Sequence, residues 1–394
     1  MTEESSSPIE DLFSEIRPYT NTEAPTVIRR LARNGGLAEA VALWKFPRLS
    51  RLSLAVASAF ARIWLLVVAL RLSTVEDLQN VIAPNLSRMI KKTSRFSASG
   101  MTGLDLRMPR VYVGNHRDIV MDPAYANYAL HRSKVRTLSV AIGDNLLSKS
   151  WIADLMRLNR SFIVKRNLPG PRALLAAAKL LSAYIGESVA IRGNPVWVAR
   201  REGRAEDGRD VTEPAVIKML TLSRDREESP ESILDTLKIV PLVISYELDP
   251  CDAMKAAELS AGVGYTKSEF EDITSIATGI IGQKGCVHLH FGTPLERQLS
   301  VAETVKAIDQ QMVEHYRLYQ TNIWAWQWLH AAVLPHDLQY DAGSISETDF
   351  RARFDAIPDE HQQWFLTMYA NPVSRALDIT VPDAEVDPRP GNPM

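Results

Sequence analysis

The sequence predicts an α/β protein with a mainly parallel central sheet flanked by helices. Between about residues 104 and 295, short runs rich in Val and Ile alternate with longer stretches of helical composition, which is the pattern typical of such a sheet. A chain of 394 residues with 46% hydrophobic residues is long enough for a substantial core. We expect the α/β domain at 101–300, between an N-terminal helical region at 1–100 and a C-terminal helical region at 301–380.

Local composition places the individual elements. Candidate strands occupy residues 110–113, 135–141, 161–164, 189–198, 239–246 and 286–291. Candidate helices occupy residues 121–131, 149–158, 170–186 and 215–223, and the third is rich in Ala and Leu, which are strong helix formers. A charged loop is expected at 223–231, a helix within 301–320, and a core or interface role for the tryptophans at 324–328. The proline-rich, acidic tail at 381–394 is expected to be disordered.

The N-terminal region contains a long apolar stretch. A short helix is expected at 25–34, ended by Gly35 and Gly36. Residues 52–70 are nearly all apolar and, as a helix, would be about 28 Å long, close to the thickness of a bilayer core. Arg62, near the middle, disfavours a spanning helix. A buried core helix and an interfacial helix remain open, as does a transmembrane span. The flanking cations favour anionic lipid; they are Lys45, Arg48, Arg51, Arg88, Lys91, Lys92 and Arg95.

Composition limits the classes of function. A formal net charge of −2 argues against a nucleic-acid-binding protein. Cys251 and Cys286 are the only cysteines, so structural zinc and a disulfide framework are not expected. Residues 1–10 are acidic and polar, unlike a signal peptide. We therefore expect a protein on the cytoplasmic side of a membrane.

The most informative motif is Val111-Tyr-Val-Gly-Asn-His-Arg-Asp-Ile-Val-Met-Asp-Pro123. A short strand here delivers His116, with Asp118 and Asp122 behind it. A histidine oriented by a carboxylate can take a proton from a hydroxyl group and pass it to a leaving group. The spacing alone leaves open which aspartate orients the histidine, although the end-of-motif position favours Asp122.

Three further segments accompany this motif. A strand-like run is followed by Arg200-Arg201-Glu202-Gly203-Arg204, in which arginines beside a glycine turn suit phosphate oxygens. The alternative interpretation of the segment at 200–204 is a charged turn on the surface, which would have the same composition. A second short strand ends in Lys165-Arg166, and a third opens on Pro241.

In their order and spacing, the four segments together resemble the motifs of the glycerolphosphate and lysophosphatidate acyltransferase superfamily, over roughly residues 110–294. The resemblance implies that His116 and Asp122 (or Asp118) are catalytic. It also implies that the substrate contacts come from Lys165, Arg166, Arg201, Glu202, Gly203, Arg204 and Pro241. Two departures stand out: five residues rather than four separate His116 from Asp122, and the block around Glu202 lacks the usual Phe-Pro.

The resemblance implies transfer of a fatty acyl group from acyl-CoA or acyl carrier protein to a phosphate-bearing lipid acceptor at a membrane surface, in phospholipid biosynthesis. No metal or other cofactor is expected. Two alternatives remain, namely a lipid-binding or scaffold protein that kept the fold without the chemistry, and a thioesterase-type hydrolase.

Overall fold

The computed structural model describes residues 11–147, 149–225, 227–262, 265, 271–334 and 338–377. The chain forms two compact units: unit 1 takes Met1–Pro84 and Ser139–Tyr184, and unit 2 takes Asn85–Leu138 and Ile185–Met394. The tail predicted to be disordered, at 381–394, and the start at 1–10 lie outside the described residues.

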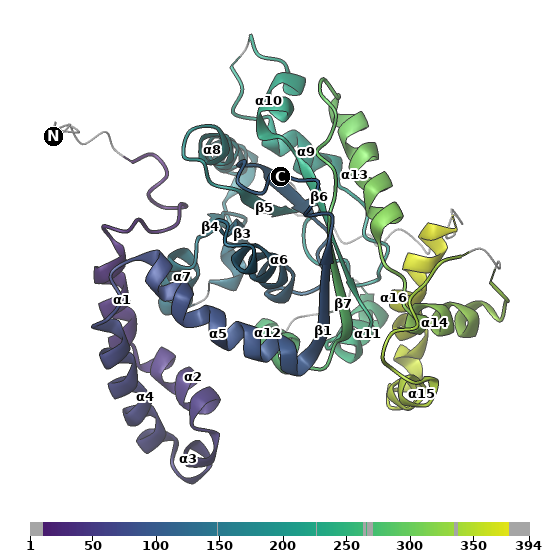
Figure 1. Cartoon of the computed structure of the whole chain (residues 1–394), viewed down its shortest axis with the longest axis horizontal. Helices are drawn as coiled ribbons and strands as arrows, with labels where there is room; N and C mark the ends of the chain where they lie inside the picture. Colours follow the sequence, from purple (N-terminus) through teal and green to yellow (C-terminus); the bar gives the residue numbers. More distant parts are fainter. Residues whose placement is uncertain are drawn as a thin grey trace. The chain divides into compact units, whose positions relative to one another are not determined.

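Unit 2 contains the larger part of the β structure (Figure 1). Its strands lie in the order β1 (Ser94–Ser99), β7 (Gly285–Phe291), β6 (Val240–Tyr246), β2 (Val111–Gly114) and β5 (Val196–Ala199). Neighbouring strands run parallel except for β6 and β7, which are antiparallel. The prediction of a mainly parallel α/β sheet is therefore confirmed. Because β2, β5 and β6 are parallel, their carboxyl ends meet at one edge, where loops from all three can build a site.

The described helices within unit 2 surround these strands and form its C-terminal part. They are α6 (Met121–Arg132), α9 (Pro214–Leu220), α10 (Pro230–Leu237), α11 (Asp252–Ala261), α12 (Glu271–Ile281), α13 (Val301–His315), α14 (Gln320–His330), α15 (Glu347–Asp355) and α16 (Asp359–Ala376). Helix α13 packs against β6 and α9, and α16 packs against α11, α13 and α14. Ser300 and Glu303 form a capping box that fixes the start of α13.

Unit 1 is mainly helical. Its helices are α1 (Ala24–Arg33), α2 (Gly35–Lys45), α3 (Pro47–Leu52), α4 (Leu54–Ala69) and α7 (Ser150–Leu158), with a short 3-10 turn η1 (Asp144–Leu146). The parallel strands β3 (Ser139–Gly143) and β4 (Ser161–Val164) also belong to it. Helices α5 (Val75–Thr93) and α8 (Gly170–Ala190) cross the boundary between the two units along the chain.

Several predicted boundaries were wrong for identifiable reasons. The strand predicted at 189–198 begins only at Val196, because α8 continues through Gly186 to Ala190. The strand predicted at 135–141 is β3, which starts at Ser139. Gly35 and Gly36 do not end a helix but begin α2, whose start is capped by the Asn34 side chain.

The predicted apolar helix at 52–70 is α4, and Ser53 separates it from α3. Its 16 residues are about 24 Å long, short of a bilayer core of about 30 Å. Within the described part of the chain, α8 alone is both long and apolar enough to cross a membrane, which by itself is weak evidence for a span.

The C-terminal helices α14, α15 and α16 share one hydrophobic cluster with α11 (Figure 1). Trp326 is buried in it and Trp324 and Trp328 pack against it, as the core prediction for 324–328 expects. The Glu247 carboxylate, fully buried at the end of β6, accepts hydrogen bonds from the backbone N–H groups of Cys286, Ser344 and Ile345 and from the Ser344 hydroxyl. One side chain thus holds the segment before α15 against the sheet.

Replacing Glu247 with Gln is expected to lower the free energy of unfolding by about 2–4 kcal/mol. The amide nitrogen would face N–H groups that need an acceptor, and an unsatisfied buried group costs about 1–3 kcal/mol. Urea denaturation followed by tryptophan fluorescence measures this. The matched control is Glu296→Gln, at an exposed position, which should change stability by less than about 0.5 kcal/mol. Equal effects of the two substitutions would contradict the anchoring role.

Candidate active site

His116 follows directly from the end of β2 through Asn115. The Asn115 side chain is buried and continues the β2–β6 pairing, because its amide donates to the Ile244 carbonyl at 2.9 Å and its oxygen accepts from the Ile244 N–H at 2.7 Å. The strand ladder therefore extends one residue further through a side chain. This fixes the direction in which the chain leaves the sheet, and with it the position of His116.

His116 and Asp122 form a close pair. The distance from His116 Nδ1 to Asp122 Oδ2 is 2.9 Å. An ionised carboxylate only accepts hydrogen bonds, so Nδ1 carries the proton and Nε2 keeps its lone pair. The imidazole lies edge-on to the Trp197 ring, with centroids 5.5 Å apart. Its side chain is 16% exposed, so the ring is held on most sides and can still meet a substrate.

The Asp122 carboxylate accepts four hydrogen bonds. Besides His116, its Oδ2 accepts from the backbone N–H groups of Arg117 at 2.6 Å and Asp118 at 2.9 Å. Its Oδ1 accepts from the Tyr246 hydroxyl at 2.6 Å. Burial, and then the nearby Asp122 charge, raise the pKa of Tyr246 well above its usual value, so the phenol stays a donor. Four donors fix this carboxylate rigidly and stabilise its negative charge.

The Asp118 carboxylate has a different structural role. Its Oδ1 accepts from the backbone N–H groups of Val120 at 3.0 Å and Met121 at 2.8 Å, so it shapes the turn that leads into α6. Burial, and then the Asp122 carboxylate, raise its pKa. This turn accommodates the extra residue between His116 and Asp122, and it leaves Asp122 as the hydrogen-bonding partner of the histidine.

The block at 200–204 lies beside His116. The Arg200 N–H donates to the Gly114 carbonyl at 3.0 Å, and the Ala205 N–H donates to the His116 carbonyl at 2.8 Å. Gly203 has φ = 72°, a left-handed conformation that glycine adopts without strain. Backbone hydrogen bonds therefore connect the turn after β5 to the histidine loop.

The two arginines of this turn differ in their surroundings. Arg201 is partly exposed and lies 3.8 Å from the Glu213 carboxylate. The Arg204 side chain is buried, donates to the Ser275 hydroxyl at 2.8 Å and pairs with Glu206 at 3.0 Å. Glu202 is exposed, and its backbone N–H donates to Glu213 at 3.0 Å. Arg201 and Glu202 are the more accessible side chains of the predicted block.

The remaining predicted residues belong to other elements of the chain. Pro241 is buried within β6, level with Val113, so it belongs to the sheet rather than to its edge. Lys165 and Arg166 follow β4 in unit 1. Lys165 forms an ion pair with Glu15, and the Arg166 N–H donates to Asp144 at 3.2 Å.

A buried ionic network supports the histidine loop. Lys255 on α11 is 1% exposed and donates to the Arg117 carbonyl at 2.6 Å, one residue after His116. It also pairs with Asp249, whose carboxylate lies 3.6 Å from the Arg117 guanidinium. Burial opposes ionisation of Asp249, but Lys255 and Arg117 outweigh it and lower the pKa of Asp249 to about 2.

The same network reaches the C-terminal helices. Tyr369 on α16 accepts from the Asp249 N–H at 2.9 Å and donates to Asp252 at 2.8 Å. Arg353 on α15 donates to the Asp249 carbonyl at 2.9 Å and to Asp252 at 2.8 Å. Helices α15 and α16 are therefore connected to the histidine loop by consecutive hydrogen bonds, a connection that no local sequence pattern indicated.

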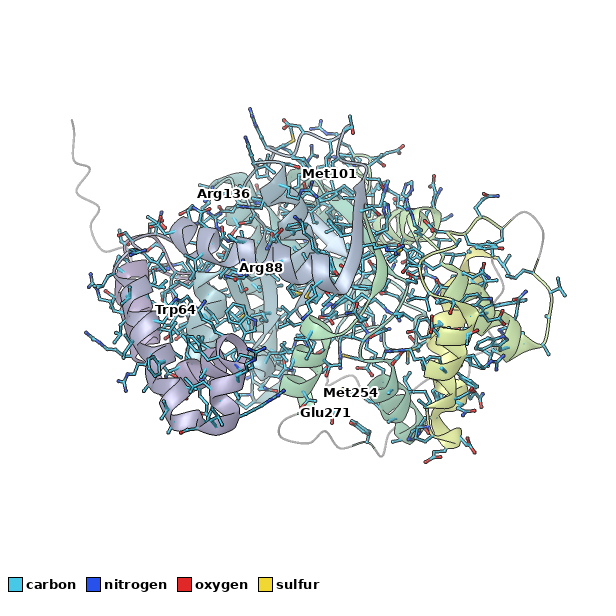
Figure 2. All side chains as sticks on the ribbon, turned by 60° about the horizontal axis from the view of Figure 1, so that its bottom comes forward. Trp64, Arg88, Met101, Arg136, Met254 and Glu271 are labelled. Carbon is cyan, nitrogen blue, oxygen red and sulfur yellow. The ribbon has the colours of Figure 1, made fainter. Side chains whose placement is uncertain are left out.

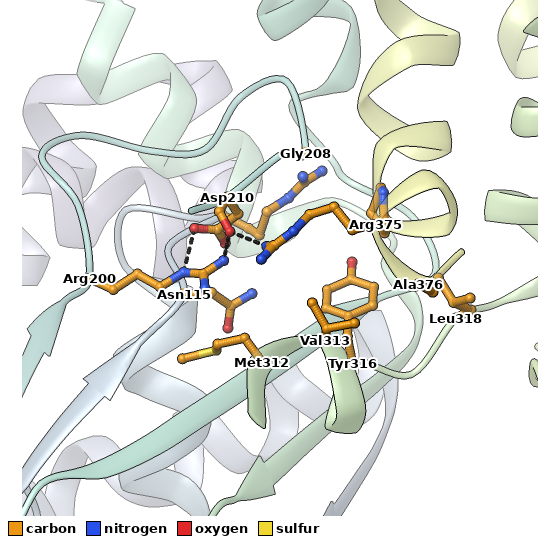
Figure 3. A pocket seen from close by; sticks show the side chains of 12 residues that line it. Asn115, Arg200, Gly208, Asp210, Met312, Val313, Tyr316, Leu318, Arg375 and Ala376 are labelled. Atoms are coloured by element: carbon orange, nitrogen blue, oxygen red, sulfur yellow. Dashed lines mark hydrogen bonds and ion pairs between the residues drawn. The ribbon is translucent and has the colours of Figure 1, made fainter. Parts of the chain in front are cut away.

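Figure 3 shows a small cavity behind this loop, lined by Arg200, Asp210, Tyr316 and Arg375 among others. Arg200 is buried and donates to Asp210 at 2.8 Å and to Asp309 at 2.9 Å. The cavity measures about 30 Å³, room for about two water molecules. It is therefore part of the support of the loop and too small for a substrate.

Comparison with known proteins relates one segment of the chain to a family. Residues 91–214 match the family model described as Acyltransferase. This segment is therefore similar to the acyltransferase family. It contains His116, Asp122 and the block at 200–204, and it ends before β6, Lys255 and the C-terminal helices.

A distant structural likeness exists to the crystal structure of the 1-acyl-sn-glycerophosphate (LPA) acyltransferase PlsC from Thermotoga maritima. The two chains share 13% identity with a TM-score of 0.36, over 60% of this chain and 78% of that one. No curated protein matches this chain in sequence.

Asp122→Asn is expected to lower kcat by about 10³–10⁴-fold, whereas Asp118→Asn should stay within about threefold of wild type. The Asp122 amide could no longer accept from all four donors and would disturb the tautomer of His116. An amide at position 118 keeps the oxygen that accepts from Val120 and Met121. Steady-state acyl-transfer assays on both purified variants measure this, and the reverse ranking would show that Asp118 orients the histidine.

Proposed function

We propose that this acyltransferase moves a fatty acyl group from a thioester, acyl-CoA or acyl carrier protein, to the hydroxyl of a phosphate-bearing lipid acceptor such as a glycerol phosphate or lysophospholipid. The observation that carries the proposal is the His116–Asp122 pair at 2.9 Å, with Nε2 left as a base. The family match over residues 91–214 supports the reaction class.

The first step is proton transfer. His116 Nε2 takes the proton of the acceptor hydroxyl as its oxygen attacks the thioester carbonyl carbon, and a tetrahedral intermediate forms. Asp122, fixed by the other three donors, stabilises the imidazolium without moving. General base catalysis of this kind contributes about 10²–10⁴-fold.

The second step is loss of the thiol. The carbon–sulfur bond breaks, and the imidazolium of His116 returns the proton to the leaving sulfur. The acyl group then resides on the acceptor oxygen, and His116 is neutral again. The chemistry as proposed uses neither an acyl-enzyme nor a metal ion.

Arg201 and the backbone of the turn at Gly203 suit the phosphate of the acceptor. They lie on the loop that is hydrogen-bonded to His116, and Arg201 is accessible. Glu202 would accept a hydrogen bond from an acceptor hydroxyl. We assign the buried Arg204 a supporting part, because Glu206 and Ser275 already hold its guanidinium. Lys165 and Arg166 remain proposed phosphate contacts on the resemblance alone.

The assay that tests the function measures thiol release from acyl-CoA with glycerol phosphate, lysophosphatidate and other lysolipids. Wild type should release thiol only with an acceptor, and His116→Ala should abolish that release. His131→Ala, on the exposed end of α6, is the matched control and should be fully active. Release without any acceptor would favour the hydrolase. A folded wild type that transfers to no acceptor from either acyl-CoA or acyl carrier protein would favour the binding protein.

We further propose that unit 1 binds the membrane surface through α2 and α4. Helix α4 is apolar around most of its circumference, yet it buries only Ala57 and Ala61. Its exposed apolar side chains are Val56, Phe60, Ile63, Leu66 and Val67, and Leu43 and Trp44 of α2 are exposed as well. Exposed apolar residues in this number on one helix pair mark an interaction surface.

Cations accompany this apolar surface. The Lys45 ammonium lies 4.5 Å from the ring centre of Trp64, which Figure 2 labels on α4. Arg62 lies within α4, and Arg48 and Arg51 lie within α3. Apolar side chains with neighbouring cations suit the headgroup region of an anionic bilayer, where a lipid acceptor would be found.

Replacing both Phe60 and Ile63 with Glu is expected to release the protein from vesicles of anionic phospholipid. Two charges would then replace the side chains that enter the apolar layer. Ile191→Glu with Ile281→Glu is the matched control, because these residues are also exposed but lie outside α4. Vesicle flotation measures the bound fraction, and equal binding of the two double variants would contradict the proposal.

A further inference from the structure

A second cavity lies at the amino-terminal end of β2, whereas His116 lies beyond the carboxyl end of that strand. Arg110 lines the cavity and immediately precedes β2. The cavity measures about 390 Å³, within the range of 300–1,000 Å³ that is common for small-molecule sites. Its buried wall includes Leu234, Ile239 and Thr304, and its exposed rim includes Lys238, Glu296 and Arg297.

Arg110 is the unusual member of this wall. The residue is 6% exposed, and its Nε has no hydrogen-bond partner. Among the described residues, no carboxylate forms an ion pair with its guanidinium. Buried charges in proteins are normally paired, because an uncompensated one costs several kcal/mol. The guanidinium therefore lacks a compensating charge within the described residues.

The other lining residues indicate the chemical class of this anion. Thr304, 1% exposed, has an Oγ1 without a partner and offers a hydroxyl donor. Of the two lining carboxylates, Asp235 is occupied by Gln298, which donates to it from its backbone at 2.9 Å and its side chain at 2.7 Å. The apolar lining consists of Met108, Leu234, Ile239, Pro294, Leu295 and Leu299.

We propose that this cavity binds a monoanionic amphiphile, a carboxylate on an apolar body. The planar guanidinium of Arg110 matches the two oxygens of a carboxylate, and the leucines receive the apolar part. Arg110, Lys238 and Arg297 exceed Asp235 and Glu296 by one charge, which balances a monoanion better than a phosphate dianion. The site is separate from the acyl-transfer site and does not depend on the proposed reaction.

The test uses isothermal titration calorimetry of the full-length protein with octanoate as the probe. Wild type is expected to bind one octanoate, and Arg110→Met to weaken binding at least tenfold. Arg107→Met, at an exposed arginine outside the cavity, is the control and should bind as wild type does. His116→Ala should also bind normally, which separates this site from the catalytic one. Equal affinity in wild type and Arg110→Met would overturn the proposal.

Two related probes test the class of ligand. Octanol carries no charge, and octyl phosphate carries more negative charge than octanoate. Each should bind to wild type at least fivefold more weakly than octanoate does. Tighter binding of octyl phosphate would overturn the assignment of a carboxylate, and equal binding of octanol would overturn the role of the charge.

Thermal unfolding without ligand separates a binding role of Arg110 from a structural one. Arg110→Met should melt at the same or a higher temperature, because it removes an unpaired buried charge. A large drop in the melting temperature would mean that the guanidinium stabilises the fold, which would contradict the binding role. Thr304→Val is the second variant, nearly the same in shape, and should weaken octanoate binding several-fold with an unchanged melting temperature. Unchanged affinity in this variant would count against the site.

Discussion

The Asp122 carboxylate is the group on which the histidine site depends. Its oxygens receive hydrogen bonds from His116, from two backbone N–H groups of the same loop and from Tyr246 on β6. A buried carboxylate is stable only when such donors surround it. The need to satisfy this one charge therefore determines the shape of the loop, its distance from β6 and the tautomer of the histidine.

Support for the loop comes from parts of the chain distant in sequence. Asn115 joins it to β6, Ala205 joins it to the turn after β5, and Lys255 holds the Arg117 carbonyl from α11. Beyond Lys255, Asp249 and Asp252 connect α15 through an ion pair with Arg353 and α16 through hydrogen bonds with Tyr369. Such buried networks are costly when incomplete and rigid when every member is paired. The described hydrogen bonds of this network satisfy its carboxylates.

Much of the fold and the central pair of the site could be predicted from sequence. Short Val-rich runs between helices revealed the parallel strands, and the position of His116 after β2 revealed its exposure at the sheet edge. Strand β1, Ser-Arg-Phe-Ser-Ala-Ser, was missed because it is polar and lacks an apolar alternation. The strand predicted at 189–198 failed because Gly186 does not interrupt a helix that is otherwise rich in Ala and Leu.

The supporting residues could not be found in the same way. Asp118 and Asp122 are both acids close to His116, and only the folded turn separates the carboxylate that binds the imidazole from the one that binds backbone. Lys255, Arg353 and Tyr369 lie more than 130 residues further along the chain and have no local signature. Pairing across such separations is determined by tertiary packing, which sequence periodicity does not report.

The hydrogen bonds from β6 and α11 to the histidine loop have a consequence for how this protein could be divided. The segment that matches the acyltransferase family ends at residue 214, yet the partners of Asn115, Asp122 and Arg117 lie at 244, 246 and 255. The family segment is thus not a module that could be moved to another protein by itself. The stretch from β6 through α16 has to accompany the histidine loop, because its side chains hold that loop in place.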